Sequence, residues 1–278
     1  MAAVARDEGP YLREWLEYHK LMGVGRFYIY DNGSTDDTRE VLEPYIRDAT
    51  VVYRRIDGYK VQMLAYNDAI RRYGLEAKWM ALIDLDEFLV PMVHERVTDF
   101  LCDFEQKHFT TSSFNKYPAI AVNWVMFDSN GHEERPAAHG GLVTANYTRV
   151  RADHNFAQVV SNDLNVKCIV NPRLVLRWTN PHNGLFVNGS TAVTERLEPV
   201  YDTKTRVHSA QQIRINHYHC KSRAEYISKL RRNTQFMGRG AYAAFDEGKL
   251  NFCGETQQDT AIFRFLPALR RALGLEEE

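Results

Sequence analysis

The first 90 residues alternate strand-like and helix-like segments, and this order restricts the possible folds more than any other feature. Because strands that alternate with helices form a parallel sheet covered on both faces, the pattern predicts an α/β fold with a Rossmann-like, mostly parallel sheet. Ligands of such sheets bind at the carboxyl ends of the strands. The expected strands cover residues 2–6, 27–30, 51–53 and 77–89, and the expected helices cover 11–22, 36–45 and 61–73.

The rest of the chain is less regular, and no repeat or linker divides it. We therefore expect a single domain over residues 1–278, with a regular half (1–90), an elaborated half (91–240) and a C-terminal extension (241–278). The expected strands of the later parts cover residues 119–127, 166–170, 174–178 and 213–219, and the expected helices cover 222–236 and 263–273.

Composition excludes several classes of function. The 35 Lys and Arg residues nearly balance the 36 Asp and Glu residues, so the net charge of -1 gives no general attraction to nucleic acid or to an anionic membrane. No apolar run approaches the roughly 18 residues that a membrane span needs. The N-terminal residues lack a signal-peptide pattern, and the four cysteines are widely spaced, which predicts a cytoplasmic chain with reduced thiols. Nothing indicates an oligomeric state.

The stretch WMALIDLDEFLVP (79–91) places Asp84, Asp86 and Glu87 at the end of an apolar strand. Three carboxylates there are costly unless a positive charge compensates them. Because side chains alternate along an extended chain, Asp84 and Asp86 are expected on one side, where their oxygens can bind Mg²⁺ or Mn²⁺. Such an ion neutralises a departing diphosphate. The alternative is a solvated, Asp-rich turn with no ligand.

A second polar turn, residues 31–36, also follows a strand and precedes a helix. The carboxylate of Asp31 can accept hydrogen bonds from a base or a ribose at this position. The alternative is a capped turn, because Asp, Asn, Gly and Ser are the residues that form turns.

Several separated motifs resemble the GT-A-type glycosyltransferases of family 92 and their bacterial relatives. They occur over residues 2–235 in the expected order. The resemblance implies a GT-A fold, a nucleotide-sugar donor of the UDP-hexose type, a divalent metal and inversion at the anomeric carbon, and it suggests galactosyl transfer. One departure is Asp128, where related versions carry glycine. The motifs are ARDEGPYLREWLEYHKLMGVGRFYIYDNGSTDDTREVL, LIDLDEFLVP, NWVMFDSNGH, KCIVNP, NPHNGLF and INHYHCKSRAEYISKLRR.

The resemblance also implies roles for single residues. Asp84 and Asp86 would serve the metal and the diphosphate, with Asp86 the more direct ligand and Glu87 orienting the site. His217 is the expected third protein ligand, and His219 is its alternative on the same strand face. Asp31 would contact the uridine, with Arg6, Asp7 and Glu8 near the base or ribose.

Further residues are expected around the diphosphate and the sugar. One or two members of the first set would bind the diphosphate, and the others would form a solvated surface. This set comprises Lys221, Arg223, Lys229, Arg231, Arg232, and more weakly Lys167, Lys60 and Gln62. The second set would face the sugar, with a helix surface or a core position as the alternative: Asn67, Asp68, His182, Trp124 and Trp178.

An inverting transfer needs a base that deprotonates the acceptor hydroxyl. Asp163 follows Asp84 by about eighty residues, roughly where GT-A enzymes carry this carboxylate. The other candidates are Glu133, Glu134, Asp128 and Glu195.

The sequence therefore predicts a metal-dependent, inverting glycosyltransferase that moves a hexose from a UDP-sugar to a hydroxyl of a glycan or glycolipid. In this prediction residues 1–90 bind the nucleotide, and residues 91–240 complete the metal site and bind the acceptor. The basic residues 221–232 are expected to form a solvated surface, and the alternative is that they contact the inner face of the membrane. The alternatives are a non-catalytic sugar-nucleotide or glycan-binding protein and a sugar nucleotidyltransferase. A nucleotidyltransferase is disfavoured because ARDEGP lacks a glycine-rich, basic loop.

Overall fold

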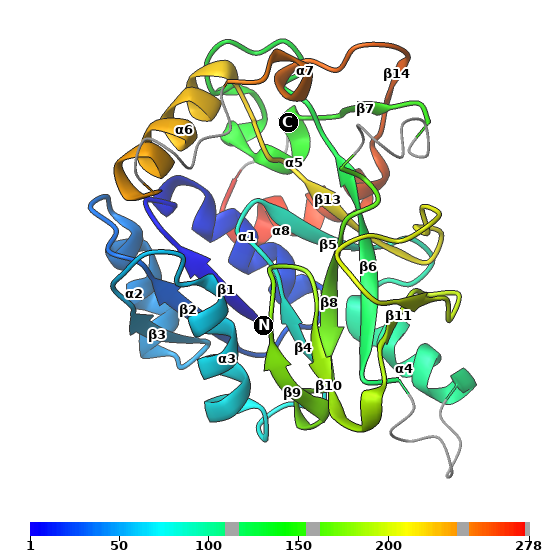
Figure 1. The fold of residues 1–278 in the computed structure, drawn as a ribbon. Helices are drawn as coiled ribbons and strands as arrows, with labels where there is room; N and C mark the ends of the chain where they lie inside the picture. Colours follow the sequence, from blue (N-terminus) through cyan, green and yellow to red (C-terminus); the bar gives the residue numbers. More distant parts are fainter. Residues whose placement is uncertain (109–116, 154–161, 238–244, 276–278) are drawn as a thin grey trace.

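A computed structural model describes residues 1–108, 117–153, 162–237 and 245–275. A ten-stranded sheet runs through the molecule in the order β12-β11-β6-β8-β4-β1-β2-β3, and β13 joins β5 to β6 (Figure 1). The strands are β1 (Ala2–Ala5), β2 (Phe27–Asp31), β3 (Val51–Arg55), β4 (Met80–Leu82), β5 (Glu87–Pro91), β6 (Ala119–Met126), β7 (Arg149–Arg151), β8 (Val166–Val170), β9 (Val175–Trp178), β10 (Gly184–Phe186), β11 (Ala192–Val193), β12 (Pro199–Val200), β13 (Ile213–His217) and β14 (Thr256–Gln258). The helices are α1 (Gly9–Leu21), α2 (Thr38–Arg47), α3 (Gln62–Tyr73), α4 (Val97–His108), α5 (Val143–Asn146), α6 (Arg223–Met237), α7 (Glu247–Leu250) and α8 (Leu266–Leu273).

The first half forms the parallel part of the sheet. Strands β4, β1, β2 and β3 are neighbours in that order, and all three pairings are parallel. Ala5 of β1 pairs with Asp31 of β2, which pairs with Arg55 of β3, so the three strands end at one edge. The predicted α/β fold, with helices around a mostly parallel central sheet, is confirmed.

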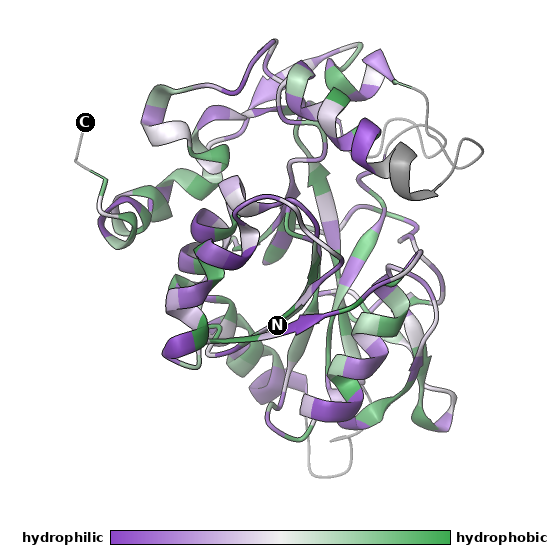
Figure 2. Cartoon of the chain, turned by 90° about the vertical axis from the view of Figure 1, so that its left-hand side faces the viewer, coloured by the Kyte–Doolittle hydropathy of each residue, from purple (hydrophilic) through white to green (hydrophobic). Residues whose placement is uncertain are grey.

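Alternating side chains along these strands separate two apolar cores. Phe27 and Ile29 of β2 pack in one core with side chains of α1, α2, α4 and α8, whereas Tyr28 and Tyr30 pack in the other with α3, β9 and β10. The helices are hydrophilic on much of their outer surface, and the inner strands are largely hydrophobic (Figure 2). None of the described helices combines the length and apolarity that crossing a membrane requires.

The predicted single strand over residues 77–89 is wrong. The chain forms two strands, β4 and β5, with Asp84, Leu85 and Asp86 in the turn between them. The physical reason is a change of partners: β4 lies between β1 and β8, whereas β5 pairs antiparallel with β13. The two aspartates are therefore not on one side of an extended segment.

Helix α1 holds β5 in place through three buried side chains. Trp15 donates its indole hydrogen to the Glu87 carbonyl at 2.8 Å, and Tyr18 donates its hydroxyl to the Leu89 carbonyl at 3.0 Å. His19 accepts from the Leu89 amide at 3.2 Å through Nε2. Because these bonds fix the first residues of β5, the turn before β5 is fixed as well.

The predicted strands of the second half are confirmed, with shifts of one or two residues at their ends. Strand β8 runs antiparallel between β4 and β6, and β13 pairs with both β5 and β6. Strand β13 ends at His217. His219 therefore lies beyond the strand, and the expectation that the two histidines share one strand face is wrong.

Candidate active site

A cavity of about 270 Å³ lies at the carboxyl edge of the parallel strands. It contacts the ends of β1 and β2, the β4–β5 turn and helix α6, which Figure 1 shows beside the end of β1. A second cavity of about 540 Å³ shares Lys229 and Arg232 with the first. The polar residues of the first cavity are Arg6, Glu8, Asn32, Lys60, Gln62, Asp84, Asp86, Lys229 and Arg232.

Asp84 is the centre of a closed group of side chains, which we call the Asp84 network (Asp84, Lys167, Gln62 and Tyr66). Lys167 donates to one carboxylate oxygen at 2.8 Å, and Gln62 and Tyr66 donate to the other at 2.5 and 3.1 Å. Only 1% of the Lys167 side chain is exposed. Burial alone would lower the pKa of Lys167, but Asp84 and Glu87 outweigh it and the pKa is raised. Asp84 therefore already has a fixed positive partner.

Glu87 lies beneath the turn and is fully buried. Its Oε2 atom accepts from the Asp84 amide at 3.0 Å, and its Oε1 atom is 3.8 Å from the Lys167 ammonium. Burial raises the pKa of Glu87 well above its usual value, although Lys167 opposes this. Glu87 thus holds the turn in place through the Asp84 amide.

Asp86 faces a different group, which we call the Asp86 cluster (Asp86, His217 and His219). Potential ligand atoms of these three residues lie within 4.8 Å of one another. His217 Nε2 is 3.5 Å from one carboxylate oxygen, and the Lys229 ammonium is 2.5 Å from the other. Burial would raise the pKa of Asp86, but Lys229 and His217 outweigh it and hold the pKa well below its usual value. Asp86 is therefore ionised and borders the cavity.

The Asp86 cluster fits a divalent cation better than the three carboxylates of the turn do. Asp84, Asp86 and Glu87 also lie within 4.8 Å of one another, but Asp84 is held by Lys167 and Glu87 by the turn amide. Over the described residues, His217 Nδ1 is buried without a hydrogen-bond partner. A carboxylate with imidazole nitrogens suits Mn²⁺, whereas Mg²⁺ prefers oxygen ligands.

The residues predicted near the nucleotide divide into two groups. Arg6 and Glu8 line the first cavity, and Asp7 lines the second. Asp31 does not line either cavity; it accepts from the Ser34 amide at 2.8 Å and from the Tyr53 hydroxyl at 2.6 Å. Burial would raise the pKa of Asp31, but these hydrogen bonds outweigh it and the pKa is lowered. Asp31 thus shapes the turn beside the cavity, which is the alternative that the sequence left open.

The predicted diphosphate-binding residues are also divided. Lys221 and Arg232 line the second cavity. The Lys221 ammonium lies 4.1 Å from the centre of the Tyr11 ring, and Arg232 donates to the Asp7 carbonyl at 2.8 Å. Arg223 instead forms ion pairs with Glu133 and Glu247. Of the basic residues on α6, Lys229 and Arg232 therefore face both cavities, and Arg223 does not line either.

Two rings, those of Trp124 and His182, lie beside His217 of the Asp86 cluster. The Trp124 ring lies 4.3 Å from the His217 ring and 5.2 Å from the His182 ring, centre to centre. His182 is fixed by the Val166 carbonyl at 2.8 Å, and burial lowers the pKa of its imidazole. Neither Trp124 nor His182 lines the first or the second cavity. Trp178, in contrast, is a core residue that contacts Phe186.

Asn67 and Asp68 line neither the first nor the second cavity but another one, of about 740 Å³, beside α3, β3 and β9, and their contact with the donor stays a prediction. Asn67 accepts from the Trp178 amide at 2.8 Å and donates to the Trp178 carbonyl at 2.9 Å, which joins α3 to β9. Asp68 accepts from Tyr30 and pairs with Arg54, Arg71 and Arg72. The helix explains this placement, because Gln62 and Tyr66 are four residues apart and face Asp84, whereas the next two residues point elsewhere. Sequence reasoning missed Tyr66, although this spacing is the signal that identifies it.

The candidate bases lie in different surroundings. Asp163 is buried and accepts from the amide of Met126, which pairs with His217 between β6 and β13. Glu134 lines the second cavity, and Glu133 is exposed and paired with Arg223. Asp128 forms an ion pair with Arg149 at 2.7 Å. The Glu195 carboxylate accepts hydrogen bonds from the backbone amides of three consecutive residues, Gln211, Gln212 and Ile213. The last two carboxylates thus have structural roles.

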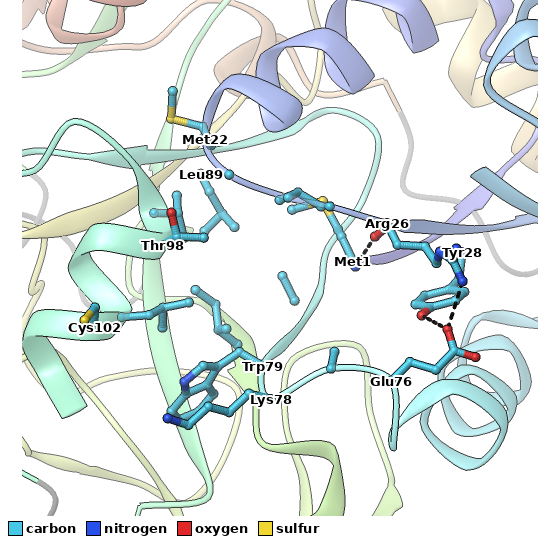
Figure 3. Close-up of a pocket in the computed structure, with 18 of the residues that line it drawn as sticks. Met1, Met22, Arg26, Tyr28, Glu76, Lys78, Trp79, Leu89, Thr98 and Cys102 are labelled. Carbon is cyan, nitrogen blue, oxygen red and sulfur yellow. Dashed lines mark hydrogen bonds and ion pairs between the residues drawn. The ribbon is translucent and has the colours of Figure 1, made fainter. Parts of the chain in front are cut away.

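Another cavity, of about 660 Å³, lies at the opposite edge of the parallel strands (Figure 3). Its walls are mostly apolar, and its polar contacts include hydrogen bonds from Tyr28 and Arg26 to Glu76. It contains none of the predicted site residues, so the ionisable groups that can do chemistry gather at the carboxyl edge.

The sequence model of glycosyltransferase family 92 matches residues 5–245. A family 92 protein of Ricinus communis is 27% identical over 202 residues, which are 71% of this chain and 34% of that protein. The galactan beta-1,4-galactosyltransferase GALS2 of Arabidopsis thaliana is 32% identical over 105 residues, which are 34% of this chain and 20% of that protein. The chain thus spans about a third or less of the length of these curated relatives.

Similarity to solved structures is much weaker. The S. aureus TarS fragment 1–349 in complex with UDP is 13% identical, with a TM-score of 0.34 over 62% of this chain and 47% of that chain. A likeness of this size carries no information on shared chemistry.

Proposed function

This chain belongs to glycosyltransferase family 92, and we propose that it transfers a hexose from a UDP-sugar to a hydroxyl group of a glycan or glycolipid. Galactose is the first sugar to test, because relatives that match part of the chain are galactan beta-1,4-galactosyltransferases. The observation that carries the proposal is the Asp86 cluster, which lies beside a cavity and two basic side chains at the carboxyl edge of the sheet.

The donor nucleotide would occupy the first cavity. Asn32 donates to the Ile56 and Gly58 carbonyls, and the Arg6 guanidinium donates to the Asn32 carbonyl, so the polar wall of this cavity is held before a ligand arrives. Arg6 and Lys60 add positive charge to the lining of this cavity. A prearranged wall lowers the entropy cost of binding.

The diphosphate would lie between the two cavities. Lys229 and Arg232 border both, and Lys221 borders the second, so up to three cations face a doubly charged leaving group. A divalent cation held by Asp86, His217 and His219, for which we propose Mn²⁺, would neutralise the charge that develops as the sugar departs. His182 and Trp124 would contact the sugar next to these ligands.

For inversion, Asp163 would accept the proton of the acceptor hydroxyl. The Met126 amide donates to its Oδ1 atom at 2.8 Å, which fixes the carboxyl group one strand away from His217. Glu134, which lines the second cavity, and Glu133 are the other candidates. Three substitutions each remove one candidate base with little change of shape: Asp163→Asn, Glu133→Gln and Glu134→Gln. The base is the residue whose variant loses transfer to an acceptor while it still binds UDP.

The proposal is tested by measuring UDP release from a panel of UDP-hexoses with Mn²⁺ and with EDTA. We expect release that requires the metal and that favours one sugar, because slow transfer to water reports the donor without an acceptor. If no sugar gives UDP release although UDP binds tightly, the proposed transferase activity is wrong, and the chain is a sugar-nucleotide-binding protein instead.

A further inference from the structure

The ammonium group of Lys229 lies inside the Asp86 cluster. Its Nζ atom is 2.5 Å from Asp86 Oδ2, 3.2 Å from His219 Nδ1 and 3.0 Å from the His219 carbonyl oxygen. Two of the three side chains that would hold a divalent cation, Asp86 and His219, thus already contact a cation that belongs to the protein.

An ion pair holds Lys229 in this position, because its ammonium lies 2.5 Å from the Asp86 carboxylate. Its side chain is 22% exposed, so it is not locked in the core as Lys167 is. Lys167 pairs with Asp84, and Lys221 lies over Tyr11, so neither contacts Asp86 in the described structure.

A doubly charged metal ion held by Asp86 and His219 would lie close to this ammonium, which is 3.2 Å from His219 Nδ1, and the two cations would repel each other. Metal binding is therefore favoured when Lys229 moves away. The direction of its movement is limited by its position: Lys229 borders both cavities, and Arg232, one helical turn further along α6, already borders them too. A diphosphate between the cavities would offer new anionic partners within reach of the flexible lysine stem.

We propose that the Lys229 ammonium competes with a divalent cation for Asp86 and His219, and that it moves to the diphosphate when metal and nucleotide bind. The proposal rests on the proposed function, because it assumes a cation at the Asp86 cluster. It assigns Lys229 a positioning role: the metal alone must compete with the ammonium, whereas the nucleotide gives the ammonium another partner. Metal and nucleotide should therefore strengthen each other's binding.

The test is Mn²⁺ titration followed by electron paramagnetic resonance, with and without UDP, on the wild type and on Lys229→Met. We expect the variant to bind Mn²⁺ alone about tenfold more tightly and the strengthening by UDP to shrink by about the same factor. Lys107→Met is the matched control, because Lys107 also lies 2.7 Å from an aspartate but on the surface of α4. This control should leave both affinities unchanged.

If Lys229→Met does not fold, as judged by circular dichroism, Lys229→Gln removes the same charge and keeps a hydrogen-bond donor for Asp86. If the charge-removing variant binds Mn²⁺ as tightly as the wild type, with and without UDP, the proposed role of Lys229 is wrong. The metal assignment to the Asp86 cluster would not be affected by that result. Absence of Mn²⁺ binding in every protein, even with UDP, would overturn the metal assignment in the proposed function as well.

Discussion

Asp84 and Asp86 are two residues apart, yet the groups around them differ in almost every respect. The Asp84 network has a buried lysine and two further donors, so its negative charge is neutralised within the protein. The Asp86 cluster has two imidazoles and a partly exposed lysine beside a cavity. The difference teaches that the two carboxylates of a D-x-D segment need not share surroundings: Lys167 holds Asp84, and we propose that Asp86 exchanges its lysine partner for a ligand.

The largest expected effect separates the two aspartates by activity. Asp86→Asn should lower kcat/KM for UDP release by about a thousandfold, because it removes the only carboxylate of the cluster and weakens the charge stabilisation of the leaving group. Steady-state assays with the preferred UDP-hexose measure this, with Asp99→Asn on the surface of α4 as the control. Activity within tenfold of the wild type would show that Asp86 is not a metal ligand.

The next prediction concerns the two histidines of the Asp86 cluster. His217→Ala and His219→Ala should each weaken Mn²⁺ binding in the presence of UDP by about ten- to a hundredfold, since each removes one nitrogen from the ligand set. Calorimetric titration measures both, and His132→Ala, a histidine that lines neither cavity, is the control. A histidine whose removal leaves the affinity unchanged is excluded as a ligand.

Asp84→Asn should affect stability more than metal affinity. The substitution leaves the buried Lys167 ammonium with only Glu87 nearby, at 3.8 Å, and should cost about 2 kcal/mol of unfolding free energy, less than for a fully buried pair because Asp84 is partly exposed. Urea unfolding gives this value. The Mn²⁺ affinity of the same variant should stay within about threefold of the wild-type affinity. Loss of metal binding with unchanged stability would reverse the roles of the two aspartates.

The last prediction concerns the pH dependence of stability that His19 causes. Burial lowers the pKa of His19 from 6.5 to about 3. Between these values the unfolded chain binds a proton that the folded chain does not, so His19 contributes stability above pH 6.5 that is lost as the pH falls. The loss should be about 2 kcal/mol between pH 7 and pH 5. In urea unfolding, the unfolding free energy of His19→Gln should depend less on pH than that of the wild type. An equal pH dependence in both proteins would contradict the lowered pKa of His19.

Sequence patterns predicted the parallel half of the sheet because its strands and helices alternate cleanly and its strand ends carry polar residues. The same patterns pointed to Asp86 as a candidate ligand, whereas only the resemblance to family 92 implied His217. They failed between β4 and β5, where the apolar residues Ile83 and Leu85 continue the strand pattern through a turn. Local patterns do not report a change of strand partner.

Contacts between distant segments were the second limit. Lys167 lies 83 residues from Asp84 and Lys229 lies 143 residues from Asp86, so only the folded chain shows which lysine neutralises which aspartate. Several basic residues on one helix are equally plausible from their sequence alone, and the direction in which α6 packs distinguishes Lys229 and Arg232 from Arg223.

The most direct test of the difference between Asp84 and Asp86 is a crystal structure with Mn²⁺ and UDP, in which anomalous scattering locates the manganese. We predict one manganese peak bound by Asp86 and by His217 or His219, with Asp84 still paired to Lys167 and the Lys229 ammonium on the diphosphate. A peak held by Asp84 and Glu87, or UDP bound with no manganese at all, would contradict this account.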